Sequence, residues 1–163
     1  RPGQYHRQGP PGWHRGVKKN GPQAIGRSRG GWTTKIHLVA ADARTALTFA
    51  LSPGQAHDAP EGRKLLQRFG KRPCPIPLLM DRAYEGDETR RLAVELGYVP
   101  VVPPKHNRCA PWDYDQVLYK RRNEIERLFR RLKGFRRLFS RFDKLDVMFI
   151  AFINFALIVD GLR

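Results

Sequence analysis

The chain has 163 residues, a length typical of one domain, and its hydrophobic fraction of 40% is enough to build a core, which excludes wholesale disorder. Lysine and arginine number 31 against 15 aspartates and glutamates, so the formal net charge is +16 and nucleic acid is the partner that best neutralises it. A basic ribosomal or membrane-surface protein would carry the same charge, so charge alone does not separate these classes.

The distribution of apolar residues and cysteines excludes further classes. The longest apolar stretch, Val147 to Val159, is shorter than the roughly 20 residues of a membrane-spanning helix, and it predicts a buried helix. The N-terminus lacks the apolar segment of a signal peptide, so we expect a cytoplasmic protein. Cys74 and Cys109 have no CxxC spacing, which argues against a structural zinc site.

Residues 1–25 predict a basic, flexible arm. The first 31 residues contain no acidic residue and show no periodic apolar pattern. Clusters such as Pro10-Pro11-Gly12 disfavour regular structure over most of this stretch.

An antiparallel hairpin and a helix are predicted next. Residues 33–41 form the first strand, Asp42 opens a short turn, and residues 47–51 return as the second strand. Asp58 is predicted to be the N-cap of a helix that runs to Phe69.

The remainder of the chain alternates strands and helices. Strands are expected at residues 76–81 and 98–102, and helices at 88–96, 116–132 and 145–162. The order β-β-α-β-α-β-α-α predicts an α/β domain with a mixed sheet and flanking helices.

Asp81 closes the short apolar run that begins at Ile76. A carboxylate at the C-terminal end of a buried strand lies at the sheet edge where α/β proteins place their active sites. The alternative is that Asp81 only caps the turn that follows it.

The predicted helix over residues 116–132 presents polar and apolar residues on adjacent faces. Spacings of three, four and seven residues place four polar side chains within an arc of about 60°. These four are Tyr119, Arg122, Glu126 and Lys133. The adjacent apolar residues, which should pack on the sheet, are Ile125, Leu128, Phe129 and Leu132. Glu124 points to the opposite side. The alternative is an ordinary amphipathic helix with a solvated polar face.

Two carboxylates from different elements can hold Mg²⁺ or Mn²⁺, which prefer oxygen ligands. Asp81 and Glu126 are the candidate metal ligands and candidate catalytic residues. On the same helix face Arg122 and Lys133 could clamp DNA phosphates, and Tyr119 could stack or form a hydrogen bond nearby.

The four polar residues, in this order and spacing, resemble the signature of DDE transposases from bacterial insertion sequences of the IS-four and IS-five superfamilies, family-five type. Segments 26–37, 53–58, 81–84 and 102–105 are similar to the same proteins. The resemblance covers about residues 17 to 163, which would be the C-terminal part of the catalytic domain.

The resemblance implies an RNase H-like fold in which three acidic residues bind two divalent metal ions. It implies metal-dependent cleavage and strand transfer of double-stranded DNA, with transposon ends and target as substrates, and we expect several copies to assemble on the DNA. Asp81 matches the segment of the second acid and Glu126 matches the third.

The first acid of that family has no match in this sequence. It should precede Gly26, yet no acidic residue occurs before Asp42, which lies in the hairpin turn. We therefore expect residues 26–163 to form a catalytic domain incomplete at its N-terminus, lacking its first strand, and residues 1–25 not to be native family sequence. The chain would be a truncated or frameshifted, inactive transposase fragment; the alternative is a non-catalytic DNA-binding remnant or regulator of a full-length transposase.

A strongly basic segment follows the predicted site. Eleven lysines and arginines lie between Lys120 and Lys144, interleaved with phenylalanines that we expect to be mostly core residues. The arginines expected to contact DNA phosphates are Arg130, Arg136 and Arg137. A structural basic protein, such as a ribosomal component, would not need the Tyr-Arg-Glu-Lys face.

Overall fold

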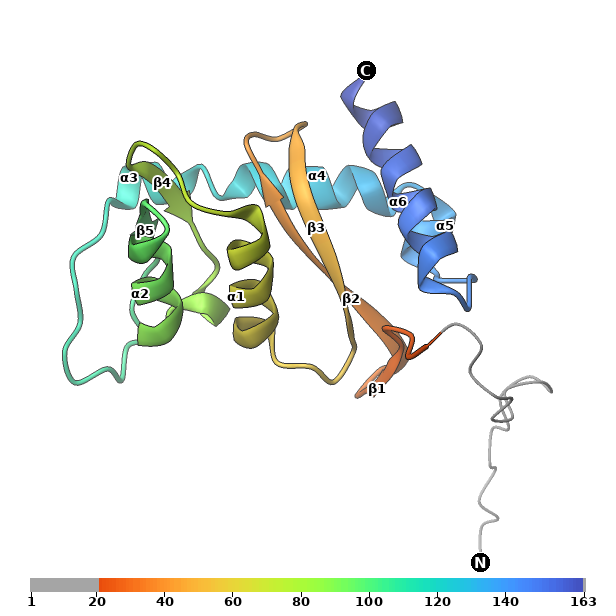
Figure 1. The fold of residues 1–163 in the computed structure, drawn as a ribbon, viewed down its shortest axis with the longest axis horizontal. Coiled ribbons are helices and arrows are strands. Elements are labelled where there is room, and N and C mark those ends of the chain that lie inside the picture. Colours follow the sequence, from red (N-terminus) through yellow and green to blue (C-terminus); the bar gives the residue numbers. More distant parts are fainter. Residues whose placement is uncertain (1–20, 163) are drawn as a thin grey trace, which may run out of the picture.

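The computed structural model describes residues 21–162 of the chain (Figure 1). Its strands are β1 (Gly26–Ser28), β2 (Gly31–Ala40), β3 (Ala46–Pro53), β4 (Ile76–Leu79) and β5 (Tyr98–Val101). Its helices are α1 (Asp58–Phe69), the single 3₁₀ turn η1 (Arg82–Tyr84), α2 (Asp87–Glu95), α3 (Gln116–Lys120), α4 (Asn123–Lys133), α5 (Arg136–Phe139) and α6 (Asp146–Gly161). The predicted α/β class is confirmed.

The predicted hairpin is present as β2 and β3, with Ile36 paired to Leu51 in an antiparallel register. Asp42 shapes the turn, because its Oδ1 accepts the backbone N–H groups of Arg44 and Thr45. The short strand β1 was not predicted. It precedes a two-residue turn into β2 at Gly31, whose positive φ of 107° suits glycine, and three residues are too few to show alternation.

The described strands form two sheets, so the prediction of one mixed sheet is wrong for this part of the chain. Strands β1, β2 and β3 form an antiparallel sheet in that order, and β4 pairs only with β5, in parallel. Because β1 reaches only Thr33, residues 34–40 of β2 have no ladder partner on the edge opposite β3 within the described residues. A cavity separates this edge from β4.

The predicted long helix is divided into α3 and α4. Between them the N–H of Arg122 bonds to Tyr119 and that of Ile125 bonds to Arg122, a tighter i to i−3 pattern. Neither glycine nor proline marks this point in the sequence. Tyr119 therefore lies on α3, whereas Glu126 lies on α4.

The apolar side of α4 packs as predicted. Leu128 is fully buried and Leu132 is 3% exposed, and both contact Ala156 of α6 in a core that also includes Leu38 of β2. In Figure 1, α4 (cyan) crosses the hairpin and extends from the α3 end of the molecule to α5 and α6. A second core, around Ala93, joins α1, α2 and β5. Helix α4 thus connects the two halves of the domain.

Residues just before β1 are held by the start of α6. The backbone N–H of Ala24 donates to Asp146 Oδ2 at 2.8 Å, and the side chain of Gln23 accepts from the backbone of Asp146 at 2.5 Å. Arg141 joins this cluster through an ion pair with Asp146. These two residues of the predicted arm are therefore bonded to α6 through their polar groups. Residues 1–20 of the predicted arm lie outside the described residues.

The longest apolar stretch forms α6, but only one side of this helix is buried. Phe149 and Ile153 face the core, whereas Val147, Phe155 and Ile158 are exposed. No helix in the described part of the chain is long and apolar enough to cross a membrane.

Because Leu128 joins the hairpin, α4 and α6, we predict that Leu128→Ala lowers the free energy of unfolding by about 2 to 5 kcal/mol. The matched control is Leu162→Ala, the same change at a side chain that is 84% exposed, which should change it by less than about 0.5 kcal/mol. Urea denaturation followed by circular dichroism measures both. Equal effects of the two substitutions would contradict this description of the core.

Candidate active site

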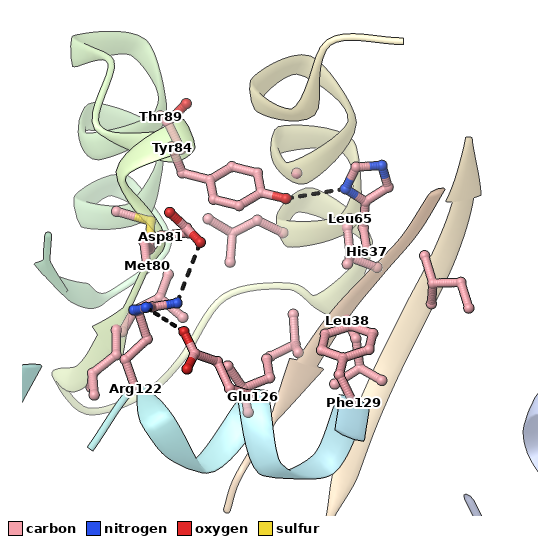
Figure 2. Close-up of a pocket in the computed structure, with 17 residues that line it drawn as sticks. His37, Leu38, Leu65, Met80, Asp81, Tyr84, Thr89, Arg122, Glu126 and Phe129 are labelled. Carbon is pink, nitrogen blue, oxygen red and sulfur yellow. Dashed lines mark hydrogen bonds and ion pairs between the residues drawn. The ribbon is translucent and has the colours of Figure 1, made fainter. Parts of the chain in front are cut away.

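A cavity of about 290 Å³ lies between the two sheets. Residues of β2 and the end of β4 form two of its sides, and α1 and α4 contribute the others. Asp81, Arg122 and Glu126 lie at this cavity together with His37 and Tyr84 (Figure 2). Chain segments far apart in the sequence therefore place five polar side chains around one space.

Asp81 follows the last residues of β4 and immediately precedes η1. Its backbone carbonyl accepts the N–H of Tyr84 at 2.8 Å, but its carboxylate makes no capping hydrogen bond to the turn. The carboxylate instead contacts Arg122, with 3.3 Å between Oδ2 and Nη1. The alternative that this side chain only caps the turn is not supported by the structure.

Glu126 lies in the first turn of α4 and approaches Asp81 from the other side of the cavity. Its Oε1 lies 2.6 Å from Nη2 of Arg122. The two carboxylates thus contact the two terminal nitrogens of one guanidinium, as the dashed lines in Figure 2 show. Both carboxylates therefore lie against the same arginine, and their roles as metal ligands stay a prediction.

Arg122 neutralises part of the negative charge that these two carboxylates bring together. Burial alone would lower the pKa of Arg122, but Tyr119, Glu126 and Asp81 outweigh it and raise the pKa above its usual value. The ring of Tyr119 also lies near this side chain, with its centroid 5.7 Å from the guanidinium carbon. The Arg122 side chain thus stays charged and is held between the acids.

The other predicted site residues lie outside the cavity. Lys133 ends α4, about 10 Å along the helix axis from Glu126. Lys133, Arg130 and Arg136 are exposed and form no ion pair with the described residues. Arg137 is also exposed and lies over the ring of Phe152. Their positive charges are available to an anionic partner.

Two other arginines of the basic segment are paired with acidic side chains of the fold. Arg131 forms a two-pronged ion pair with Asp160, which is only 3% exposed, and also bonds to the carbonyl of Ala43. Arg141 pairs with Asp146 at 2.5 Å. These two side chains tie α4 and the segment before α6 to the rest of the fold, so fewer cations of this segment are left unpaired than its composition suggests.

The prediction for Asp58 is also corrected. His57 occupies the N-cap position of α1, without a side-chain capping bond, and Asp58 is the first helical residue. The Asp58 carboxylate pairs with Nζ of Lys35 at 2.8 Å, which joins α1 to β2.

Sequence reasoning assigned no role to three polar residues beside the site, of which His37 and Ser52 are buried and Tyr84 is partly buried. His37 of β2 contacts Tyr84 of η1 through Nδ1 at 3.1 Å and Ser52 of β3 through Nε2 at 2.8 Å. Segments 26–37 and 81–84 resembled the family, but no single residue there predicts this contact.

The chemistry of the cavity fits a divalent cation in part. Asp81 and Glu126 offer the carboxylate oxygens that Mg²⁺ and Mn²⁺ prefer. No group of three histidine, cysteine, aspartate or glutamate side chains that could hold a metal ion occurs among residues 21–162. The nearby buried Glu85 does not add a ligand, because it is paired with Lys105 and Arg108.

Comparisons with known proteins indicate the family of the chain. The sequence profile of the family described as "Transposase DDE domain" matches residues 8–159. A curated protein of Brucella ovis that carries the name of a transposase for insertion sequence element IS6501 is 30% identical over 132 residues, covering 80% of this chain and 99% of the relative. The search of solved structures gave no match.

If the two carboxylates form a cation site, Asp81→Asn and Glu126→Gln should each weaken Mn²⁺ binding by at least about tenfold, because each removes a charged ligand. Isothermal titration calorimetry on the chain measures this. Glu124→Gln is the matched control: this residue is on the same helix but pairs with Arg121, so its loss should leave Mn²⁺ affinity unchanged. An equal loss in all three variants would show that Mn²⁺ binds by overall charge and not at this pair.

Proposed function

Because the chain belongs to the transposase DDE domain family, we propose that it is part of an insertion-sequence transposase that binds transposon-end DNA and takes part in metal-dependent cleavage and strand transfer. The observation that carries the proposal is the meeting of Asp81 and Glu126 on one guanidinium inside a cavity. We assign these two residues as the second and third acids, and the family-five type of insertion sequence as the closest type.

A divalent cation, Mg²⁺ or Mn²⁺, would be held by Asp81 and Glu126 and would supply an activated attacking oxygen and a stabilised leaving oxygen. The protein itself supplies positioning and charge. Arg122 lies between the carboxylates and is the side chain that must move, or turn toward a DNA phosphate, when the cation is bound. Its place at the α3–α4 junction, where the helical hydrogen bonds change, favours such a movement.

The exposed cations on and after α4 form the surface that we assign to DNA. Lys133, Arg130, Arg136 and Arg137 share this region, and none is committed to an acidic partner within the described residues. They would contact phosphates, which fixes the DNA on the protein without reading its sequence. Assembly of several copies on the DNA stays a prediction.

An RNase H-like fold is also part of this proposal. The free edge of β2 and the strand β4 face each other across the cavity, with Leu38 and Leu78 among its apolar lining residues. Backbone groups at such an edge are available to a further strand. We propose that a strand carrying the first aspartate lies here, between β2 and β4, where it would join the two sheets into one and bring its carboxylate to Asp81 and Glu126.

The second candidate function is a DNA-binding remnant or regulator without catalytic activity. It is favoured by one observation, the presence of only two of the three acids among the described residues that line the cavity. The two candidates share the DNA-binding surface and differ in the cutting of DNA.

DNA binding should depend on Lys133 and Arg136. We predict that Lys133→Gln/Arg136→Gln weakens duplex binding and reduces the slope of log K against log salt by up to about 2, because roughly 0.9 counterion is released for each phosphate contact. Fluorescence anisotropy at several salt concentrations measures this. Lys71→Gln/Arg91→Gln removes the same charge from exposed positions near β4 and on α2 and should leave the slope nearly unchanged. If both double variants change the slope equally, the surface that includes Lys133 of α4 and Arg136 of α5 is not the DNA-binding surface.

The 163-residue chain should bind the element's ends without Mg²⁺- or Mn²⁺-dependent cleavage or strand transfer, because electrostatic positioning by all three acids supplies most of the rate. A chain extended upstream by an aspartate-bearing strand should gain both activities and lose them again with Glu126→Gln. Gel assays on end-labelled DNA measure them. If the 163-residue chain cleaves DNA and still does so with Glu126→Gln, both the assignment of Glu126 to the site and the expected inactivity of this chain are refuted. If the extended chain is inactive, the second candidate function, a non-catalytic DNA-binding remnant, is favoured.

A further inference from the structure

Asp81 lies in a stretch of backbone that has few ties to the sheet. The β4–β5 ladder ends at Leu79, and the last bond beyond it is from the N–H of Met80 to Val101 at 3.0 Å. After Met80 the chain enters the η1 turn, which is closed by the hydrogen bond from the Tyr84 N–H to the Asp81 carbonyl. The position of Asp81 therefore depends on what holds Tyr84.

Tyr84 is held by a buried polar chain that crosses the cavity. Its hydroxyl lies 3.1 Å from Nδ1 of His37, and Nε2 of His37 lies 2.8 Å from the hydroxyl of Ser52. His37 and Ser52 are 5% and 1% exposed, and they come from the two paired strands β2 and β3. Figure 2 shows Tyr84 extending from the segment of Asp81 toward His37. The hydrogen bond thus joins the hairpin directly to the turn that carries Asp81.

The ring of Tyr84 occupies a space that α1 leaves open. A Cβ atom on Gly62 would lie 2.4 Å from Cε1 of Tyr84, so the two carbon atoms would clash. Glycine is otherwise unfavourable inside a helix, by roughly 1 kcal/mol relative to alanine. Gly62 therefore gives α1 room to pack over this ring.

Charges around the link keep it in one protonation state. Burial raises the pKa of Tyr84 to about 12, and Asp58 and Asp81 act in the same direction, so the phenol remains a donor. Burial lowers the pKa of His37; Lys35 of β2 acts in the same direction, and Asp58 and Glu61 of α1 oppose it. A neutral His37 can accept from Tyr84 at Nδ1 and donate to Ser52 from Nε2, which satisfies all three groups.

We propose that the Tyr84–His37 hydrogen bond is a positioning link for the active site, which holds Asp81 across the cavity from Glu126. The inference rests on the proposed function, since it concerns the same carboxylate pair. Tyr84 and His37 act through Asp81 and are not catalytic residues. Met80, bonded to β5, and Tyr84, bonded to β2, hold the two ends of the Asp81 segment, so the carboxylate faces the cavity in a defined position.

The test compares three variants of the 163-residue chain. Tyr84→Phe removes only the hydroxyl, and Gly62→Ala displaces the ring while it favours the helix. The matched control is Tyr98→Phe: this tyrosine is more deeply buried than Tyr84, and its hydroxyl accepts from Arg72 and donates to the carbonyl of Gly70, away from the cavity. Circular dichroism and thermal unfolding establish that each variant is folded.

Two readouts separate positioning from a general loss of stability. We expect Tyr84→Phe and Gly62→Ala to weaken Mn²⁺ binding by about 10- to 100-fold, as loss of a residue that orients a metal ligand does, and Tyr98→Phe to leave it unchanged. We also expect the amide of residue 84, which bonds to Asp81, to exchange with deuterium at least about tenfold faster in the first two variants only.

The inference is overturned if Tyr84→Phe changes both readouts no more than Tyr98→Phe does. Failure of the proposed function gives a different result: the unmodified chain and the Asp81→Asn variant would bind Mn²⁺ with the same affinity, or neither would bind it. In that case the exchange rate of the residue 84 amide decides alone, because it reports the link without any metal.

Discussion

The packing of α4 is the constraint on which the rest of the structure depends. Leu128 and Leu132 bury one side of this helix against α6 and against β2, through residues such as Leu38. Burial of such side chains contributes about 1.5 to 3 kcal/mol each. Since Glu126 lies within one turn of Leu128 on the same rigid helix, the core that stabilises the domain also fixes where this carboxylate lies. Arg131, paired with Asp160, adds a polar contact between α4 and α6.

Asp81 is positioned in a different way, because it follows a strand and is not part of a packed helix. Two carboxylates brought together without a cation would repel each other, and Arg122 reduces this repulsion by contacting both. All three side chains keep some contact with solvent, so the pairs stabilise the fold only modestly. Their arrangement is better explained by function than by stability. Glu126 is fixed on a rigid helix, whereas the Arg122 guanidinium between the two acids can move. This combination suits the proposed site, in which a divalent cation would replace the guanidinium as the positive charge.

The sequence was sufficient to predict features that follow from local pattern. The alternation of apolar and polar residues predicted the hairpin, and a short apolar run predicted β4. Helical spacing placed Glu126 beside the buried Leu128. Features that depend on contacts between distant segments could not be predicted from the sequence. In the sequence Arg131 is one arginine in a basic run, and only its contact with the buried Asp160 distinguishes it from its exposed neighbours. The bond between His37 and Tyr84 likewise depends on how the two sheets are placed.

The facing edges of β2 and β4 connect the fold to the charge balance of the site. Within the described residues, Asp81 and Glu126 share the single charge of Arg122, which leaves the cluster of three with one net negative charge. A strand inserted along β2 would satisfy backbone groups of the open edge and add a third carboxylate. Three carboxylates would leave two net negative charges, more than one guanidinium can balance in a partly enclosed cavity. The proposed strand would therefore link completion of the sheet to a requirement for divalent cations, because it would join the two sheets and also bring negative charge that such cations can neutralise.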